Sequence, residues 1–277
     1  MIVCRPGKEI PVDDLINDLN EKIYTRKNTA LNVKVRNIIG MKQAEYDIIT
    51  HDSNTLYVTY DDYIIRLLED ATDPFEDGSL VTKLMLNGDS TDLLGNNDFS
   101  SVDIVYESGY LHDCAIFDKD TVKLYYTFGT WSNNEWAFSV WINPTIIDTA
   151  EIRTVLDIQG INQGRFIISL SETTNPNTNI NIFHGGDWHD TGIAAQVGIW
   201  QHLVFTSDGT NFKLFLDNSE IYTAAATSER PDRNTAIGTN YATSDYYYLG
   251  KIDQVEFYNR GLTNDEIRAL YYTEEFQ

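Results

Sequence analysis

The strongest constraint on the fold is the alternation of short apolar segments with turn clusters from Val81 onward. The segments are rich in Phe, Val, Ile and Leu, and the stretches between them are rich in Gly, Asn, Asp and Ser. Turn signals spaced by about 8–12 residues are typical of an antiparallel sandwich or barrel. The clearest predicted strands are Phe138–Pro144, Arg165–Leu170, Asn179–Phe183, Gln201–Thr206, Phe212–Asp217 and Lys251–Tyr258.

The last predicted elements are a strand and a short helix after Leu249. Thr263 and Glu266 have the spacing of a capping box, in which each side chain binds the backbone N–H of the other residue. We therefore expect the closing strand to lead into a capped terminal helix. Together they would seal two stacked antiparallel layers.

The first 80 residues have a different pattern. Val12–Arg26 has apolar residues on one helical face, and it is followed by alternating segments that predict strands. Ala71–Ser79 concentrates Asp, Pro, Gly and Ser, which is typical of a linker. The chain is therefore predicted to be mainly β, with a small α+β domain at residues 1–80 and a β-sandwich at 81–277.

Charge limits the possible partners. The net charge is −22, and the residues after Lys83 hold 27 acidic against 10 basic side chains. Such an acidic surface argues against nucleic acid, because that binding needs Lys and Arg to displace counterions from phosphate. Excess acid favours solubility, or alternatively the binding of a hard divalent cation.

Cysteine and hydropathy patterns point to the compartment. Cys4 and Cys114 are far apart in the sequence and are expected to be free thiols. The N-terminus has no apolar signal-peptide core, and no apolar run of about 18 residues could span a membrane. We expect a protein that is made and assembled in the cytoplasm and is not inserted in a membrane.

Three stretches of the predicted sandwich resemble the laminin-G-like, concanavalin-A-like jelly-roll family. Phe138–Pro144 is similar to its early Trp-containing strand, and Trp200–Asn218 to its Trp-x-His strand and Asp-Gly hairpin. Leu249–Tyr271 is similar to its closing strand and helix. The resemblance covers residues 84–277 and implies an antiparallel jelly-roll β-sandwich. It implies little about function, because one fold hosts many functions.

A second resemblance lies in the first domain. Lys42–Asp62 looks like a small hairpin unit of bacteriophage tail-fibre and virion appendage proteins. Together, the two resemblances imply a virion protein that docks at one end and displays a recognition domain at the other.

The family resemblance also implies a structural Ca²⁺ between an early loop and the closing strand. The loop offers Asp89, Asp92 and Asp98, and the strand offers Asp253. Two or three carboxylates with backbone carbonyls would satisfy Ca²⁺. The alternative is a solvated turn, since Asp favours turns by itself.

Aromatic residues in polar loops are the candidate ligand contacts. Trp131 and Trp188 lie in such loops, and an exposed indole can stack on a sugar ring. Tyr241 and Tyr246 lie near the ends of the last strands and could join them. Tyr246 begins a run of three tyrosines, in which the alternation of side chains along a strand predicts that Tyr247 is buried. Trp141 and Trp200 are expected in the core.

Catalysis and zinc binding have little support in the sequence. His184, Asp187, His189 and Asp190 resemble a zinc set, but a fourth ligand elsewhere is missing, which favours a flexible loop. The Glu-x-Asp-x-x-Glu string of related glucanases is absent. Asp253 and Glu256 are three residues apart, which predicts opposite faces of a strand. No G-x-S-x-G motif occurs.

The sequence thus predicts a non-enzymatic virion structural protein, such as a fibre, appendage or capsid decoration protein. Its sandwich would bind host-surface carbohydrate or a neighbouring virion subunit. The first domain is too small to be stable by itself, which favours a homo-oligomer or docking on other virion proteins. The alternatives are a stand-alone carbohydrate-binding lectin module and, with less support, a glycanase.

Overall fold

The computed structural model divides into two compact units, Met1–Ala71 and Thr72–Glu275. It describes residues 2–3, 37–41, 55–59, 64–65, 73–75, 77–110, 113–118, 122–129, 131, 134–159, 164–173, 176–231, 234–241 and 246–274.

The described part of the first unit is two pairs of strands. β1 (Ile2–Val3) pairs antiparallel with β4 (Ile64–Ile65). β2 (Asn37–Met41) pairs with β3 (Thr55–Thr59) in parallel. The hairpin predicted at Lys42–Asp62 stays a prediction, because within that segment only β3 is described, and its partner β2 precedes the segment. The predicted helix at 12–26 and the predicted strand at 46–49 lie outside the described residues.

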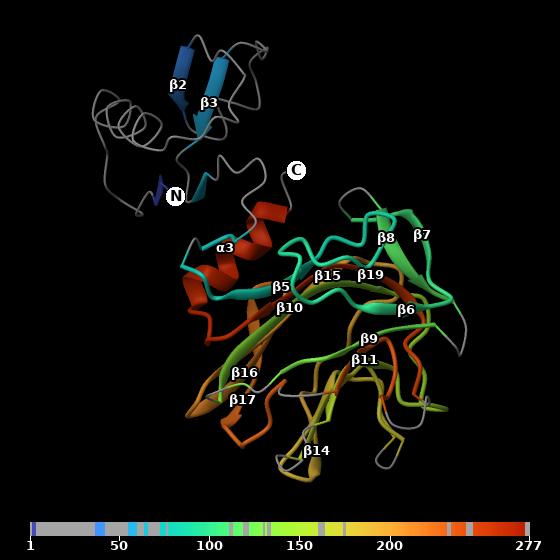
Figure 1. Cartoon of the computed structure of the whole chain (residues 1–277). Coiled ribbons are helices and arrows are strands. Elements are labelled where there is room, and N and C mark those ends of the chain that lie inside the picture. The colour runs from blue at the N-terminus through green and yellow to red at the C-terminus, as the bar shows by residue number, and fades with distance from the viewer. Residues whose placement is uncertain are drawn as a thin grey trace. The chain divides into compact units, whose positions relative to one another are not determined.

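The second unit is a sandwich of two antiparallel sheets, which confirms the predicted fold class (Figure 1). One sheet has eight strands in the order β17-β16-β15-β10-β19-β8-β7, and β5 pairs with β19. Its strands are β5 (Leu80–Leu84), β7 (Val105–Ser108), β8 (Asp113–Phe117), β10 (Glu135–Pro144), β15 (Gln201–Asp208), β16 (Asn211–Leu216), β17 (Ser219–Ala225) and β19 (Gly250–Tyr258).

The other sheet has seven strands in the order β14-β13-β12-β11-β18-β9-β6. They are β6 (Ser100–Val102), β9 (Lys123–Thr127), β11 (Thr154–Gln159), β12 (Arg165–Ser169), β13 (Asn181–His184), β14 (Asp187–Asp190) and β18 (Asn234–Ile237). The chain crosses repeatedly between the sheets, as a jelly roll does.

Aromatic side chains fill the space between the sheets. The ring of Trp136 lies 4.5 Å from that of Phe205, which lies 4.5 Å from that of Phe166. Phe138 and Phe257 continue this layer with ring centroids 5.0 Å apart. All five residues are fully buried. Burying one such side chain contributes about 1.5–3 kcal/mol, so this layer is a substantial part of the hydrophobic stabilisation of the sandwich.

The C-terminal helix α3 (Asn264–Glu274) covers part of the outer face of the eight-stranded sheet (Figure 1). Ile267 and Leu270 pack there against Leu80 and Tyr258. The predicted capping box is confirmed: the Thr263 N–H donates to Glu266 Oε2 at 2.8 Å, and the Glu266 N–H donates to Thr263 Oγ1 at 3.3 Å. No helix of the described residues covers the outer face of the seven-stranded sheet.

A β-bulge in β19 corrects one prediction. Ser139 pairs with Glu256 and Trp141 pairs with Asp253, so β19 holds one more residue than β10 over this span. Gln254 takes up the extra length in a left-handed conformation, with φ 49°. Asp253 and Glu256 therefore lie on the same face, because an extra residue resets the alternation of side chains along a strand.

Cys114 is a buried free thiol, as predicted, and Cys4 lies outside the described residues. Burial and the nearby Asp253 carboxylate raise the pKa of the Cys114 thiol to about 12, so it stays protonated at neutral pH. Within the described residues, no helix is both long and apolar enough to cross a membrane.

Candidate functional site

The outer face of the seven-stranded sheet carries a row of residues in register across six strands. The row is Tyr125, Ala236, Asp157, Ile167, Phe183 and Trp188, from β9 to β14. The neighbours of these residues along each strand, such as Leu156 and Ile168, point into the core, so the row points outward. We call this surface the row face. Its centre is buried, and Tyr125, Phe183 and Trp188 are half-buried.

An ion pair occupies the middle of the row face. Arg165 Nε and Nη2 donate to the two carboxylate oxygens of Asp157 at 2.9 and 3.1 Å. Asp157 is fully buried, whereas the Arg165 side chain is 30% exposed. The bidentate geometry fixes the guanidinium plane. The sequence contained a signal for this pair: Asp157 is the one charged position within the apolar strand at 154–158.

The segment that connects β18 to β19 closes one side of the row face. The Tyr241 N–H donates to Asp157 Oδ2 at 2.7 Å, and the Tyr246 carbonyl accepts from the Thr154 N–H at 3.1 Å. The two predicted contact residues, Tyr241 and Tyr246, are thus both tied to β11 and both half-buried. β11 thus anchors the backbone of both residues.

Simple alternation fails in the tyrosine run. Tyr248 is buried, at 1% exposure, and Tyr247 is only half-buried. The prediction that Tyr247 is the buried residue is therefore wrong. The reason is that Tyr246 has a left-handed backbone, with φ 63°, which breaks the strand periodicity. The Tyr248 hydroxyl donates to the Lys251 carbonyl at 3.0 Å.

Trp188 lies on a hairpin rather than in a loop. β13 and β14 pair from Asn181–Asp190 to His184–Asp187 around Gly185 and Gly186. Trp188 packs edge-on against Phe183, with ring centroids 5.3 Å apart. The indole remains half-buried, which leaves part of it available for contact at the end of the row.

Trp131 is a correction. It is only 8% exposed and packs into the core against Phe128, with ring centroids 5.9 Å apart. The polar sequence around it predicted an exposed indole, but the segment turns its Trp side chain inward to shield the core. Trp141 is buried as predicted, whereas Trp200 is half-buried beside Tyr110.

The histidines of the hairpin point away from the row face, toward the core edge. His184 shares a 2.8 Å hydrogen bond with the Tyr222 hydroxyl and stacks on His189 at 4.2 Å. Burial, followed by the nearby His189, lowers the pKa of His184. Among the described residues, no group of three His, Cys, Asp or Glu side chains could hold a metal ion. The segment is a hairpin and not the predicted flexible loop.

The four predicted calcium ligands are not assembled into such a group either. Asp92 is buried, and its carboxylate accepts the backbone N–H groups of Lys83, Leu94, Asn96 and Asn97. Asp98 accepts the Asp92 N–H, and Asp89 accepts the Thr91 N–H. Asp253 instead accepts the N–H groups of Tyr110 and Gln254. Asp89, Asp92 and Asp98 thus bind backbone groups in and around their loop, Asp253 lies in the strand β19, and the calcium site stays a prediction.

An amide cluster beside the row face was not predicted from the sequence. Asn181 Nδ2 donates to Asn177 Oδ1 at 2.9 Å, and Asn179 Nδ2 donates to both Asp190 oxygens, at 2.9 and 3.1 Å. Three Asn residues at every second position were visible in the sequence. Asn179 and Asn181 were assigned to the predicted strand Asn179–Phe183, and their spacing gave no sign that the amides would meet.

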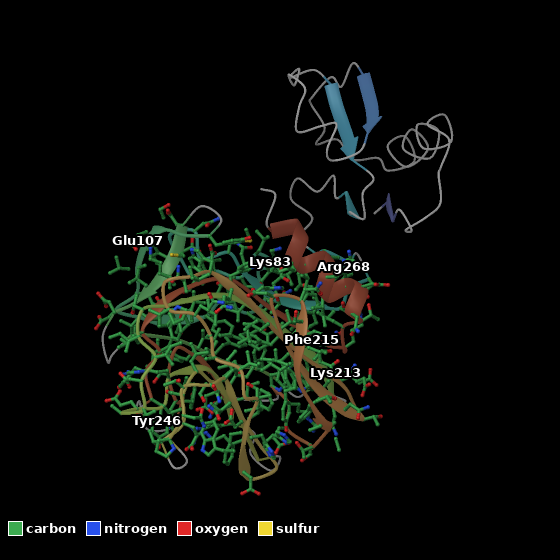
Figure 2. The ribbon with its side chains drawn as sticks, turned by 180° about the vertical axis from the view of Figure 1, so that it is seen from behind. Lys83, Glu107, Lys213, Phe215, Tyr246 and Arg268 are labelled. Atoms are coloured by element: carbon green, nitrogen blue, oxygen red, sulfur yellow. The ribbon has the colours of Figure 1, made fainter. Side chains whose placement is uncertain are left out.

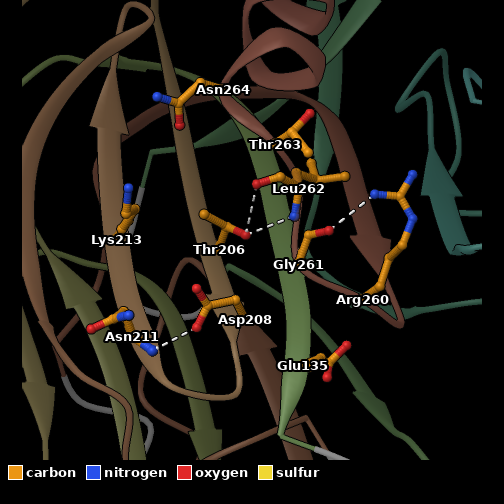
Figure 3. Close-up of a pocket in the computed structure, with 10 residues that line it drawn as sticks. All are labelled: Glu135, Thr206, Asp208, Asn211, Lys213, Arg260, Gly261, Leu262, Thr263 and Asn264. Atoms are coloured by element: carbon orange, nitrogen blue, oxygen red, sulfur yellow. Dashed lines mark hydrogen bonds between the residues drawn. The ribbon is translucent and has the colours of Figure 1, made fainter.

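A cavity of about 350 Å³ lies on a different part of the sandwich (Figure 3). Its lining residues are Glu135, Thr206, Asp208, Asn211, Lys213, Arg260, Gly261, Leu262, Thr263 and Asn264. Lys213, in this cavity, and Tyr246, beside the row face, lie on different sides of the molecule (Figure 2).

The polar groups of this cavity mostly bind other protein groups. Thr206 Oγ1 accepts the Leu262 N–H at 2.8 Å, and Asp208 accepts the Asn211 N–H at 2.7 Å (Figure 3). Lys213 pairs with Glu220, and Arg260 pairs with Asp77 and Glu266. None of its described lining residues is aromatic. The cavity is therefore best explained as the space left where the β15–β16 turn packs against the residues before α3.

Solved structures with the same fold include carbohydrate-related proteins. Domain 4 of AbnA, an extracellular arabinanase from Geobacillus stearothermophilus in complex with arabinotriose, is 21% identical with a TM-score of 0.58, covering 70% of this chain and 98% of that one. The binding domain of Paraclostridial Mosquitocidal Protein 1 is 16% identical, with a TM-score of 0.54 and coverage of 70% and 52%. At these identities the likeness shows the fold alone.

A sialidase from Trypanosoma rangeli in complex with sialic acid is 14% identical with a TM-score of 0.57, covering 72% of this chain and 33% of that one. This chain thus spans about half of the toxin domain and a third of the sialidase. No curated protein matches the chain. Residues 118–268, more than half of the chain, match the family model Laminin_G_3, and the protein therefore belongs to the concanavalin A-like lectin/glucanases superfamily.

Proposed function

We propose that the sandwich binds carbohydrate at the row face. The observation that carries this proposal is the combination, on one face of the sheet, of a fixed and partly exposed guanidinium, Arg165, with two half-buried aromatic rings, Phe183 and Trp188. Aromatic rings stack on the apolar side of a sugar, while planar polar groups bind its hydroxyls.

Two further observations support this location. The outer face of the eight-stranded sheet is partly covered by α3, whereas no helix among the described residues covers the row face. The arabinanase domain, which has the same fold over nearly its whole length, was solved with arabinotriose. That trisaccharide is therefore a sensible first probe.

We propose binding without cleavage. Glycosidases need two carboxyl groups that flank the scissile bond. On the row face the central carboxylate, Asp157, is already held by Arg165, Gln159 and the Tyr241 N–H. Incubation with arabinan, followed by a reducing-sugar assay, tests this part, and sugar release would contradict it.

The virion setting stays a prediction. It rests on the resemblance of Lys42–Asp62 to appendage proteins, and with it the expected homo-oligomer and virion partners. A trimer in size-exclusion chromatography with light scattering would favour a fibre, whereas a monomer that binds glycan would favour the stand-alone lectin.

The Trp188→Ala substitution tests the row face. We expect arabinotriose, or the best ligand from a glycan array, to bind about tenfold or more weakly, because one stacking contact is lost. Isothermal titration calorimetry measures the affinity.

Asn211→Ala, in the cavity of Figure 3, is the matched control and should leave the affinity unchanged. The opposite pattern, with a loss only in the Asn211 variant, would move the site to that cavity.

A further inference from the structure

We infer that the row face selects neutral saccharides and rejects anionic ones, and that Asp157 sets this preference by neutralising Arg165. This inference rests on the proposed function, because it specifies the ligand class of the same site.

The first step is the charge of the ion pair. Asp157 Oδ1 and Oδ2 accept from Arg165 Nε and Nη2, so the central cation of the row face already has its counterion. The carboxylate is fully buried beneath the guanidinium. A ligand carboxylate placed above Arg165 would therefore meet a neutral pair, with a second carboxylate directly behind it.

The second step is the donor that remains. Arg165 Nη1 makes no hydrogen bond with another described residue, and the side chain is 30% exposed. A guanidinium held through Nε and Nη2 presents its Nη1 edge outward in a fixed plane. Such an edge suits a sugar hydroxyl or ring oxygen, which accepts hydrogen bonds without bringing charge.

The third step is the surroundings. Gln159 and Asn234 pair across β11 and β18 on this face, and both are half-buried. Amides donate and accept, as sugar hydroxyls do. The exposed charged residues of β14, Asp187 and Asp190, lie on either side of Trp188 and are both negative. Lys123, at the far end on β9, lies over the ring of Tyr125, 5.5 Å from its centroid.

The fourth step is the electrostatic field produced by the net charge of the whole sandwich. The residues after Lys83 have 27 acidic and 10 basic side chains. A polyanionic glycan would approach against this charge, whereas a neutral glycan would not be affected. Local pairing and the overall field therefore favour the same ligand class.

Competition between matched trisaccharides on the full chain tests the inference. The neutral probes are arabinotriose and maltotriose, and the anionic probe is trigalacturonate. We expect at least one neutral probe to bind at least about tenfold more tightly than trigalacturonate, because like charges across an interface are strongly unfavourable. Binding of the neutral probe should not change between about 50 and 500 mM NaCl, since no charged ligand is screened.

Two variants distinguish the local effect of Asp157 on ligand preference from the effect of the overall negative charge. Asp157→Asn leaves Arg165 without its counterion and should reduce the preference for the neutral probe about tenfold or more. Asp265→Asn removes the same charge from an exposed position of α3, away from the row face, and should leave the preference unchanged. Thermal unfolding is measured first for both. If the Asp157 variant does not fold, the inference is tested by two wild-type measurements. These are the affinity ratio of the neutral and anionic probes and the salt dependence of neutral binding.

The outcomes are distinct. Equal or tighter binding of trigalacturonate, or neutral binding that weakens with salt, would overturn the inference while the proposed carbohydrate binding stands. An unchanged preference in a folded Asp157→Asn variant would remove Asp157 from the explanation. Failure of every saccharide to bind, including those on a glycan array, would overturn the proposed function itself.

Discussion

At the scale of single residues, polar side chains in this sandwich are often buried on the outer faces of the sheets. His202 is fully buried on β15 and shares a 2.8 Å hydrogen bond with Ser139 Oγ on β10. The ring of Trp141, its cross-strand neighbour on β10, lies 4.9 Å from the His202 ring, and the ring of Tyr271 from α3 lies 6.1 Å from it. A strand with one polar face therefore does not imply that this face meets water.

The buried His202 predicts a dependence of stability on pH. Burial lowers the pKa of His202 from 6.5 to about 3. The unfolded chain then binds the proton more readily than the folded chain, so this contribution is complete above pH 6.5 and is lost as the pH falls toward 3. The loss is about 5 kcal/mol at most. Urea unfolding between pH 4.5 and 7.5 measures it.

The matched control replaces both partners with apolar residues. The Ser139→Val, His202→Leu double variant leaves no unpaired polar group, because both hydrogen-bonding partners are removed together. Its free energy of unfolding should change less between pH 7 and 4.5 than that of the wild type. Equal slopes would assign the acid sensitivity to other groups, among them His184.

At the scale of elements, the segment after β18 positions one side of the row face. Gly238 ends β18 with φ 79°, and a Cβ at this residue would overlap the ring of Phe117. The next residues return across β11, where Tyr241 and Tyr246 bind. The path of this segment thus depends on the close approach of the residue 238 backbone to the Phe117 ring, which only glycine permits.

Gly238→Ala should destabilise the sandwich and weaken ligand binding together. We expect a loss of about 2–4 kcal/mol, from left-handed backbone strain plus displacement of the core ring of Phe117. Gly192→Ala is the matched control, since Gly192 has φ 73° and an added methyl group would meet no atom within 4 Å. It should lose only about 1 kcal/mol. Thermal and urea unfolding measure the loss of free energy of unfolding in each variant. Equal losses in the two variants would contradict the argument that Gly238 is required by the close packing of Phe117.

At the scale of the whole molecule, the excess of acidic side chains dominates the response to ions. The net charge is −22. Self-repulsion destabilises the compact state, and salt screens it, so the melting temperature should rise with ionic strength. This effect needs no specific ion site.

Calcium distinguishes general screening from a specific site. At matched ionic strength we expect CaCl₂ and MgCl₂ to raise the melting temperature equally, because the Asp92 carboxylate is already satisfied by backbone N–H groups. Stabilisation that is larger with Ca²⁺ and saturates with its concentration would support the calcium site expected from the family resemblance, since selective binding to the folded state adds free energy. Differential scanning fluorimetry measures both.

Much of the fold could be predicted because local patterns carry it. Strand periodicity and turn residues located β10, β12, β15, β16 and β19, and the capping box located α3. The hairpin strand β14 was missed because its Gly, Asp and His residues resemble a loop. Of the predicted contact residues, Trp188, Tyr241 and Tyr246 lie at the row face, whereas Trp131 lies in the core.

By itself, then, the sequence determined the class of the fold, because alternation and turns act between near neighbours in the chain. Only the tertiary structure decided which polar residues meet. Asp157 and Arg165 pair through strand register, and the bulge at Gln254 decides on which face Asp253 and Glu256 lie. Register and bulges depend on contacts between strands distant in the chain, and a shift of one residue exchanges the two faces of a strand.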